Sequence, residues 1–261
     1  LAIGLGAEGR KTALGAASAN LILAAIVISE LMRRGGDYLI FETSRVILDD
    51  PKLTLGFAVD GMSGVLLLLT AIVTFCAVYI SPEKAPDGRM KLYHISPLLI
   101  SSGALGAFCS TDLFFLFAFH ELALIPTFLM IGIYGHGRDK LAVAWKITIY
   151  LGVGSLVLLG GLIALYSSLT VPGTATFNIV ELTARAKEID LDPEVQKWIF
   201  LPLFLGFGIL VSLFPFHSWA APAYASAPTS ISMLHAGVLK KFGLYGILRV
   251  AMPMLPKGFE A

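Results

Sequence analysis

The chain alternates between long apolar runs and short polar segments. Apolar runs of about 20 residues recur along the whole length, and this is the length that a helix needs to cross the hydrocarbon core of a bilayer. Glycine, proline and charged residues separate the runs. The pattern predicts seven transmembrane spans, at about residues 13–32, 61–80, 93–110, 113–134, 142–166, 198–215 and 230–250.

The composition favours a membrane protein, because 56% of the residues are apolar and only 14% are charged, whereas soluble domains have roughly 25% charged residues. Only helices and closed barrels satisfy the backbone in lipid, and these runs are too long for barrel strands. We therefore expect an all-α polytopic membrane protein, with residues 1–261 in a single transmembrane helical domain. The apolar stretch at residues 1–6 is interpreted as the tail of an earlier span, and the chain as a fragment of a longer protein.

Two longer polar connections, residues 33–60 and 167–197, lack the composition of separate domains. The second predicts a short surface helix, because Glu181, Ala184, Arg185 and Glu188 recur at helical spacing.

Basic residues are concentrated in short connections at residues 84–91 and 136–140, and the positive-inside rule places both in the cytoplasm. The net charge of +1 provides no basic face for nucleic acid. The two cysteines, Cys76 and Cys109, fit neither a metal-binding nor a disulfide spacing.

Glu121 is the strongest candidate for a functional residue, because a charge near the middle of a bilayer costs about 2.5–3.5 kcal/mol. It follows Asp112 by about 13.5 Å along the same predicted helix, which places it near the membrane midplane. Burial favours the neutral carboxyl, and a nearby cation favours the charged one. An acid balanced between these influences can gain and lose a proton near neutral pH.

Lys240 and Lys241 lie midway along the last predicted span, a depth from which neither side chain extends easily to the interface. Neighbouring helix positions differ by about 100°, so the two lysines face different neighbours. One is expected to point into a hydrated bundle interior, and the other toward a partner subunit or a second cavity. Lys146 lies close to the end of its span, where a lysine that reaches the interface is an equally good explanation.

Three histidines, His120, His217 and His235, supply groups that titrate near neutral pH and are suited to proton relay. Each is equally well explained by packing or hydrogen bonding. Their spacing contains no metal-binding signature.

Three prolines, Pro215, Pro222 and Pro228, follow the sixth predicted span. Because proline removes a backbone donor and kinks or ends a helix, we expect this span to break. Broken backbone is tolerated at membrane depth where it lines a cavity, and transporters place ion sites at such breaks. A simple loop at the interface is the alternative.

Several segments together resemble one known family. They are Val59–Ser63, Asp112–Pro126, Lys146 at the start of the next span, Phe214–Trp219, Ala227–Thr229 and Ala236–Arg249. In this order they resemble the antiporter-like membrane subunits of NADH:quinone oxidoreductase, the respiratory complex I, and within these subunit M, the counterpart of mitochondrial chain 4. The resemblance covers roughly residues 55–250.

The resemblance implies the first inverted half of a fold of about fourteen transmembrane helices, with one broken helix and one proton path in this half. It implies that Glu121 is the glutamate of the fifth helix, and that Lys241 is the eighth-helix lysine that leads protons toward the bundle centre. The chain would then be a proton-translocating subunit of the complex in a bacterial inner membrane, coupled to quinone reduction elsewhere in the complex.

One position departs from the family pattern, because Leu210 stands where the family has a lysine that pairs with the glutamate. Lys146, His217 or Lys241 could supply the countercharge instead, or this half no longer pumps and serves as a scaffold. Two alternatives remain: a subunit of a multi-subunit sodium/proton antiporter and a subunit of a membrane-bound hydrogenase. Both are relatives that have the same helices.

No cofactor is expected in this chain, since it has no cysteine cluster and no dinucleotide-binding glycine motif. The resemblance implies that NADH, flavin, iron–sulfur clusters and quinone are bound in partner subunits. The expected partners are the other membrane-arm subunits, the lipid bilayer and protons.

Overall fold

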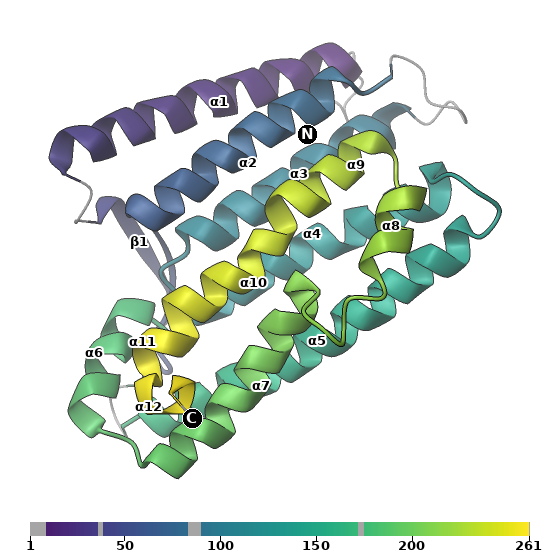
Figure 1. Cartoon of the computed structure of the whole chain (residues 1–261). Helices are drawn as coiled ribbons and strands as arrows, with labels where there is room; N and C mark the ends of the chain where they lie inside the picture. Colours follow the sequence, from purple (N-terminus) through teal and green to yellow (C-terminus); the bar gives the residue numbers. More distant parts are fainter. Residues whose placement is uncertain (1–8, 36–38, 83–89, 172–174, 261) are drawn as a thin grey trace.

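The computed structural model describes residues 9–35, 39–82, 90–171 and 175–260, which form an elongated bundle of helices (Figure 1). Six helices in this part are long and apolar enough to cross a membrane. They are α1 (Gly9–Arg34), α2 (Gly61–Tyr79), α3 (Met90–Cys109), α4 (Leu113–Tyr134), α5 (Lys140–Leu169) and α7 (Pro193–Val211). They overlap the first six predicted spans, and the chain is a multi-pass helical membrane protein.

Aspartates cap the start of two of these helices. Asp60 accepts a hydrogen bond from the backbone N–H of Ser63, and the Ser63 hydroxyl accepts one from the backbone N–H of Asp60, both at 2.8 Å. This reciprocal pair satisfies two donors that the start of a helix leaves free. Asp112 caps α4 by accepting from the backbone N–H groups of Phe114 and Phe115. The two caps fix where α2 and α4 begin.

The seventh predicted span is helical but irregular. Helical backbone continues from Thr229 to Met254 through α9 (Thr229–Leu234), the π-helical turn η1 (His235–Leu239), α10 (Lys240–Gly246), a second π-helical turn η2 (Ile247–Ala251) and α11 (Met252–Met254). Figure 1 shows this run in yellow along the middle of the bundle. It packs against α2 through α9 and against α7 through α10, and the short α12 (Pro256–Phe259) also packs against α7.

The predicted break in the sixth span lies between α7 and the short α8 (Ala220–Ser226). Helix α7 ends at Val211, and Ser212 follows it in the left-handed region with φ of 65°. The sequence predicted that this span continues to Pro215. The helix ends earlier, at Val211. The reason is that proline restricts the residue before it and offers no N–H to the preceding turn.

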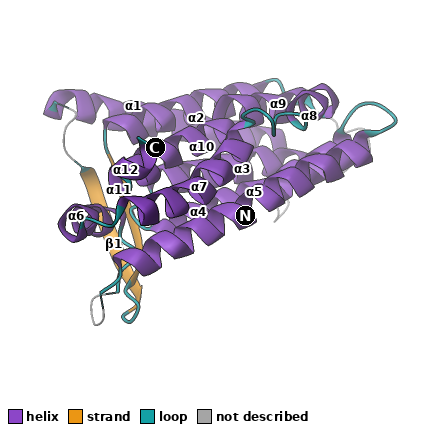
Figure 2. Cartoon of the chain, turned by 60° about the horizontal axis from the view of Figure 1, so that its bottom comes forward, coloured by secondary structure: helices purple, strands orange, loops and turns teal. Residues whose placement is uncertain are grey.

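A β-hairpin at one end of the bundle (Figure 2) is not among the predicted elements. Strands β1 (Ile40–Leu48) and β2 (Leu53–Val59) pair antiparallel inside the connection that we expected to be a polar loop. Strand β2 buries alternate residues against the bundle, whereas β1 is exposed along most of its length. The predicted surface helix is present as α6 (Ile179–Ile189), beside the hairpin.

Glycines permit the closest helix approaches beside the break. A Cβ atom on Gly154 of α5 would lie 2.7 Å from the side chain of Ile209 in α7. A Cβ atom on Gly243 of α10 would collide with the carbonyl of Phe207 and the side chain of Val211, both in α7. Helices α5 and α10 therefore both contact the last turns of α7 at backbone distance.

Candidate functional site

The carboxylate of Glu121 on α4 has two polar neighbours. Ser155 of α5 donates its hydroxyl hydrogen to Oε1 of Glu121 at 2.6 Å, and Nδ1 of His120 lies 3.3 Å from the same oxygen. The Glu121 side chain is 34% exposed and lines a mostly apolar crevice of ≈ 330 Å³ between α4 and α5, in which Thr127 and Thr148 are the other polar residues. The acid is therefore held on one side and open on the other.

The carboxylate of Glu121 lies level with the end of α7. Its donor Ser155 follows Gly154 on α5, and Gly154 packs against Ile209 in the last turn of α7. Leu210, at the position of the expected family lysine, is 2% exposed and packs within the apolar core. The acid and the broken helix consequently share one depth in the bundle, although α7 contributes no charge there.

His120 extends the polar site toward the centre of the bundle. Its ring is 3% exposed and stacks on Phe242 of α10, with ring centroids 4.1 Å apart and planes at 19°. Phe242 in turn packs against Phe207 of α7. His120 thus connects the crevice at Glu121 to the central helical run.

Lys240 lies at the break itself. Its ammonium donates to Oγ of Ser212 at 2.7 Å, and it lies 5.5 Å from the ring centre of Trp219 and 4.9 Å from that of Tyr224. Aromatic faces attract a cation at these distances. The Trp219 indole is fixed by donating to the backbone carbonyl of Ile209 at 3.3 Å. The end of α7 and the turns after it therefore form a site for the Lys240 ammonium.

His235 lies between the two groups of residues. It is buried, its Nδ1 is 3.5 Å from the hydroxyl oxygen of Tyr224, and its ring meets the ring of Trp219 edge to face. His235 lies in η1, five residues before Lys240 in the same helical run, and η1 packs against α4, the helix that carries His120. The structure therefore brings together Glu121, His120, His235 and Lys240 from three segments.

Other predicted site residues lie elsewhere. No hydrogen bond or ion pair joins Glu121 to Lys146, His217 or Lys241 among the residues that the structure describes; the basic group beside it is His120. Lys146 precedes Ser155 on α5 by about 13.5 Å along the helix axis. His217 is exposed in the turns after α7 and stacks on Phe214. Lys241 is half-buried on α10.

Sequence reasoning missed Ser155, Ser212, Trp219 and Tyr224, which supply the polar and aromatic surroundings. A serine in an apolar helix gives little signal, because most such hydroxyls bond to the carbonyl four residues earlier. Ser167 on the same helix does so. Trp219 and Tyr224 follow a proline-rich break, and this location is the one signal that could have identified them.

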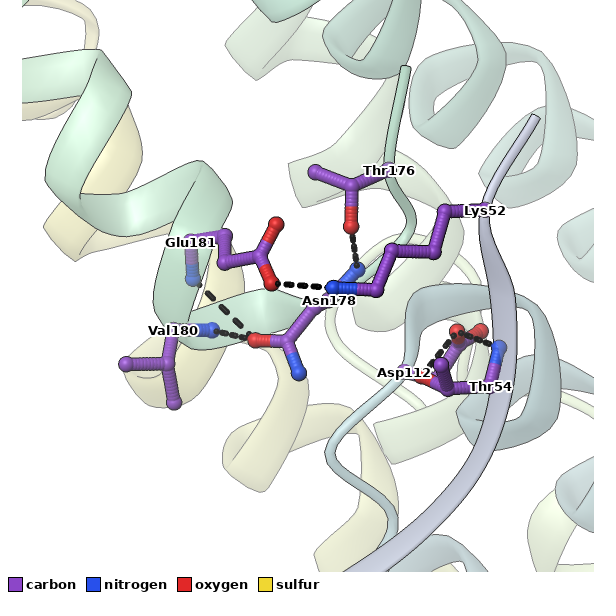
Figure 3. A network of polar contacts seen from close by, with 7 residues as sticks. All are labelled: Lys52, Thr54, Asp112, Thr176, Asn178, Val180 and Glu181. Atoms are coloured by element: carbon purple, nitrogen blue, oxygen red, sulfur yellow. Dashed lines mark hydrogen bonds and ion pairs between the residues drawn. The ribbon is translucent and has the colours of Figure 1, made fainter. Parts of the chain in front are cut away.

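A second polar network, shown in Figure 3, connects the hairpin to α4 and α6. Asp112 is fully buried, and its Oδ2 accepts from the backbone N–H and the hydroxyl of Thr54 at 3.1 and 3.3 Å. Burial raises the pKa of Asp112, and these hydrogen bonds oppose the shift. Lys52 pairs with Glu181 at 3.0 Å, and burial of Glu181 is outweighed by hydrogen bonds from Lys52 and Thr176 that lower its pKa.

The fold and the site define the class: a multi-pass membrane protein with ionisable side chains clustered beside a broken helix. Within the described residues, no group of three or more His, Cys, Asp or Glu side chains is placed to hold a metal ion. The chain belongs to the family described as NADH:quinone oxidoreductase/Mrp antiporter, TM, whose model matches residues 110–260, more than half of the chain.

Among its relatives is NAD(P)H-quinone oxidoreductase chain 4 3 of Picosynechococcus sp., which is 35% identical over 199 residues, or 76% of this chain and 34% of the relative. Among solved structures, respiratory complex I from Thermus thermophilus superimposes with a TM-score of 0.81 at 25% identity, over 96% of this chain and 50% of the matched chain. The Mrp complex from Dietzia sp. shares the fold, with a TM-score of 0.76 at 20% identity over 98% of this chain and 46% of that one. The chain spans at most half the length of these proteins.

Proposed function

We propose that this chain is the proton-translocating first half of a membrane-arm subunit of NADH:quinone oxidoreductase. In this proposal Glu121 takes up and releases a proton while quinone is reduced in partner subunits. The family match and the likeness to a respiratory complex I support the proposal. The observation that carries it is the Glu121 carboxylate, held by Ser155 and His120 at the depth of the α7 break.

The surroundings of Glu121 suit an acid that changes its charge. An ionised carboxylate at mid-membrane costs about 2.5–3.5 kcal/mol, and hydrogen bonds to a charged group return about 1.5–3 kcal/mol each. The two forms of the acid are therefore close in free energy, and a change of charge nearby can shift the balance by several kcal/mol in a low dielectric. In this proposal the proton exchanges through the crevice beside the carboxylate, past Thr127 and Thr148.

The wider setting is also proposed. NADH, flavin, iron–sulfur clusters and quinone would be bound by partner subunits, and the chain would lie in a bacterial inner membrane beside other membrane-arm subunits. Residues 136–140 would face the cytoplasm, with the hairpin on the opposite side. The other predicted cytoplasmic connection, residues 84–91, lies largely outside the described residues.

Replacing the carboxyl of Glu121 by an amide tests the proposal. In membranes that contain the assembled complex, Glu121→Gln should lower the number of protons moved per quinone reduced, while quinone reduction partly survives. Asp112→Asn is the matched control, because it makes the same chemical change on the same helix outside the site. An unchanged proton ratio in Glu121→Gln would refute the role of Glu121 and favour a scaffold that does not pump.

A subunit of a sodium/proton antiporter is the second candidate, favoured by the shared fold of the Mrp complex. Membrane vesicles separate the two functions. An antiporter would produce a sodium-driven pH change without NADH, whereas the proposed subunit requires NADH oxidation for proton movement.

A further inference from the structure

The last helical run contains two adjacent lysines in different surroundings. Lys240 donates to Ser212, the residue that follows α7, and its ammonium lies near the faces of Trp219 and Tyr224. Lys241 is half-buried and has no hydrogen-bond or ion-pair partner among the described residues. A positive charge at this depth needs compensation, and only Lys240 has it in the part of the chain that the structure describes.

The π-helical turn η1 determines which lysine faces the break. It extends over His235–Leu239, directly before Lys240. A π turn holds one residue more than an α turn, so it rotates all following side chains by one position. Without the extra residue of this turn, each of the two lysine side chains would point in a direction different from the one that it has now. Such turns occur frequently at functional sites.

One ring nitrogen of His235 is not used by any hydrogen bond in the described part of the chain. Its Nε2 is buried and has no hydrogen-bond partner among the described residues, while its Nδ1 faces the Tyr224 hydroxyl. Buried polar atoms are nearly always paired with protein or with ordered water. A bound water is therefore the natural partner of Nε2, and it would connect His235 to its polar surroundings.

We propose that Lys240, acting through His235 and His120, is the basic group coupled to Glu121 in this chain. This inference rests on the proposed function and goes beyond it, because the family pairs the glutamate with a lysine at the position of Leu210, and the resemblance gives Lys241, not Lys240, a place in the proton path. Lys240 reaches the end of α7 from a neighbouring helix, two residues beyond Leu210. It thereby supplies a cation to the break, although α7 itself has Leu210 where the family has a lysine.

The transfer conserves protons. The Lys240 ammonium gives a proton to one nitrogen of His235, whose other nitrogen releases one, and His120 repeats this exchange toward Glu121. One N–H bond breaks at the lysine and one O–H bond forms at the carboxylate, so both groups become neutral together. Release of the proton from Glu121 into the crevice and reprotonation of Lys240 at the break complete the movement of one proton.

The two lysines can be compared directly in membranes that contain the assembled complex with the full-length chain. The readouts are protons moved per quinone reduced and the rate of quinone reduction. Lys240→Met should lower the proton ratio to the value of Glu121→Gln, and combining the two changes should cause no further loss. Lys241→Met should retain most of the wild-type ratio. Lys197→Met, which removes an exposed lysine paired with Glu194, is the matched control.

Moving the cation separates proton transfer from packing. Lys240→Leu alone should lose the proton ratio, and adding Leu210→Lys should restore it, because the amine then returns to the break from α7. A structural role of Lys240 would give no such rescue. A loss in Lys241→Met without one in Lys240→Met, or no rescue in an assembled complex, overturns the inference. Unchanged pumping in Glu121→Gln would instead overturn the proposed function.

Discussion

Helix α4 carries two acids about 13.5 Å apart along its axis, and they are held in opposite ways. Asp112, at the hairpin end, accepts hydrogen bonds from three backbone N–H groups and one hydroxyl. Glu121, deeper in the bundle, has one hydroxyl donor and one histidine, and it faces a crevice. Asp112 is fully buried, whereas about a third of the Glu121 side chain is exposed.

The comparison shows that the hydrogen-bond donors around an acid distinguish a structural role from a role in proton exchange. Every donor around Asp112 is either backbone or a side chain fixed by the hairpin, so removing its acceptor oxygens disturbs the fold locally. Around Glu121, one donor is a histidine that can itself change protonation state. The four predictions below test this contrast, starting with the largest expected effect.

Removing the Ser155 hydroxyl should weaken the ionised state of Glu121. A hydrogen bond to a charged group contributes about 1.5–3 kcal/mol, which corresponds to roughly a tenfold change or more in the population of the ionised form. Ser155→Ala should therefore slow proton movement by about tenfold in a vesicle assay. The control is Ser167→Ala on the same helix, whose hydroxyl donates to the carbonyl of Ile163. Equal rates in both variants would contradict the prediction.

Truncating Asp112 should affect stability and not proton movement. Asp112→Ala removes the cap of α4 and the bonds to Thr54, a loss of about 1–2 kcal/mol in the free energy of unfolding. Asp112→Asn retains a capping acceptor and should cost less. Denaturant unfolding of the purified protein in detergent measures both. If Asp112→Ala were as stable as wild type, the cap would make no contribution to the free energy of unfolding.

The same pair of variants has a predicted pH dependence. Because burial raises the pKa of Asp112, the native state binds this proton more tightly than the unfolded chain. The carboxyl therefore favours folding at low pH, and this contribution is lost as the pH rises through the raised pKa. Asp112→Asn cannot titrate and should lack this part of the dependence.

Breaking the Lys52–Glu181 ion pair should have the smallest effect. Both side chains are nearly half exposed, 46% and 40%, and exposed pairs contribute about 0.2–1 kcal/mol. Lys52→Ala should lower the free energy of unfolding by no more than this amount, and the difference should shrink at high salt. A larger loss that is insensitive to salt would mean that Lys52 supports the hairpin by packing.

Much of the fold could be predicted because lipid imposes a simple rule on helix length. The ranges of α1, α2 and α4 follow from apolar length, and the break after α7 follows from Pro215. The hairpin was missed because Glu42 and Arg45 make β1 look like a polar connection. Its β-branched residues and the Asp50–Pro51 turn were signals that hydropathy alone does not register.

The site was predictable only in part, for a different reason. Glu121 stands out because an acid in lipid is costly, and that reasoning needs no partner. The choice between Lys240 and Lys241 depends on helical register, and regular periodicity fails where η1 adds a residue. Partners such as Ser155 come from helices distant in sequence, so no local pattern identifies them.

The hairpin also has a mechanical consequence. Backbone bridges connect Lys52 to Thr176, Phe57 to Ser110 and Asp112 to Asn178, which fastens the chain before α4 and α6 to one small sheet. Such fastening resists sliding of these helices at that end. The sheet therefore holds the starts of α4 and α6 in a fixed register at the hairpin end of the bundle.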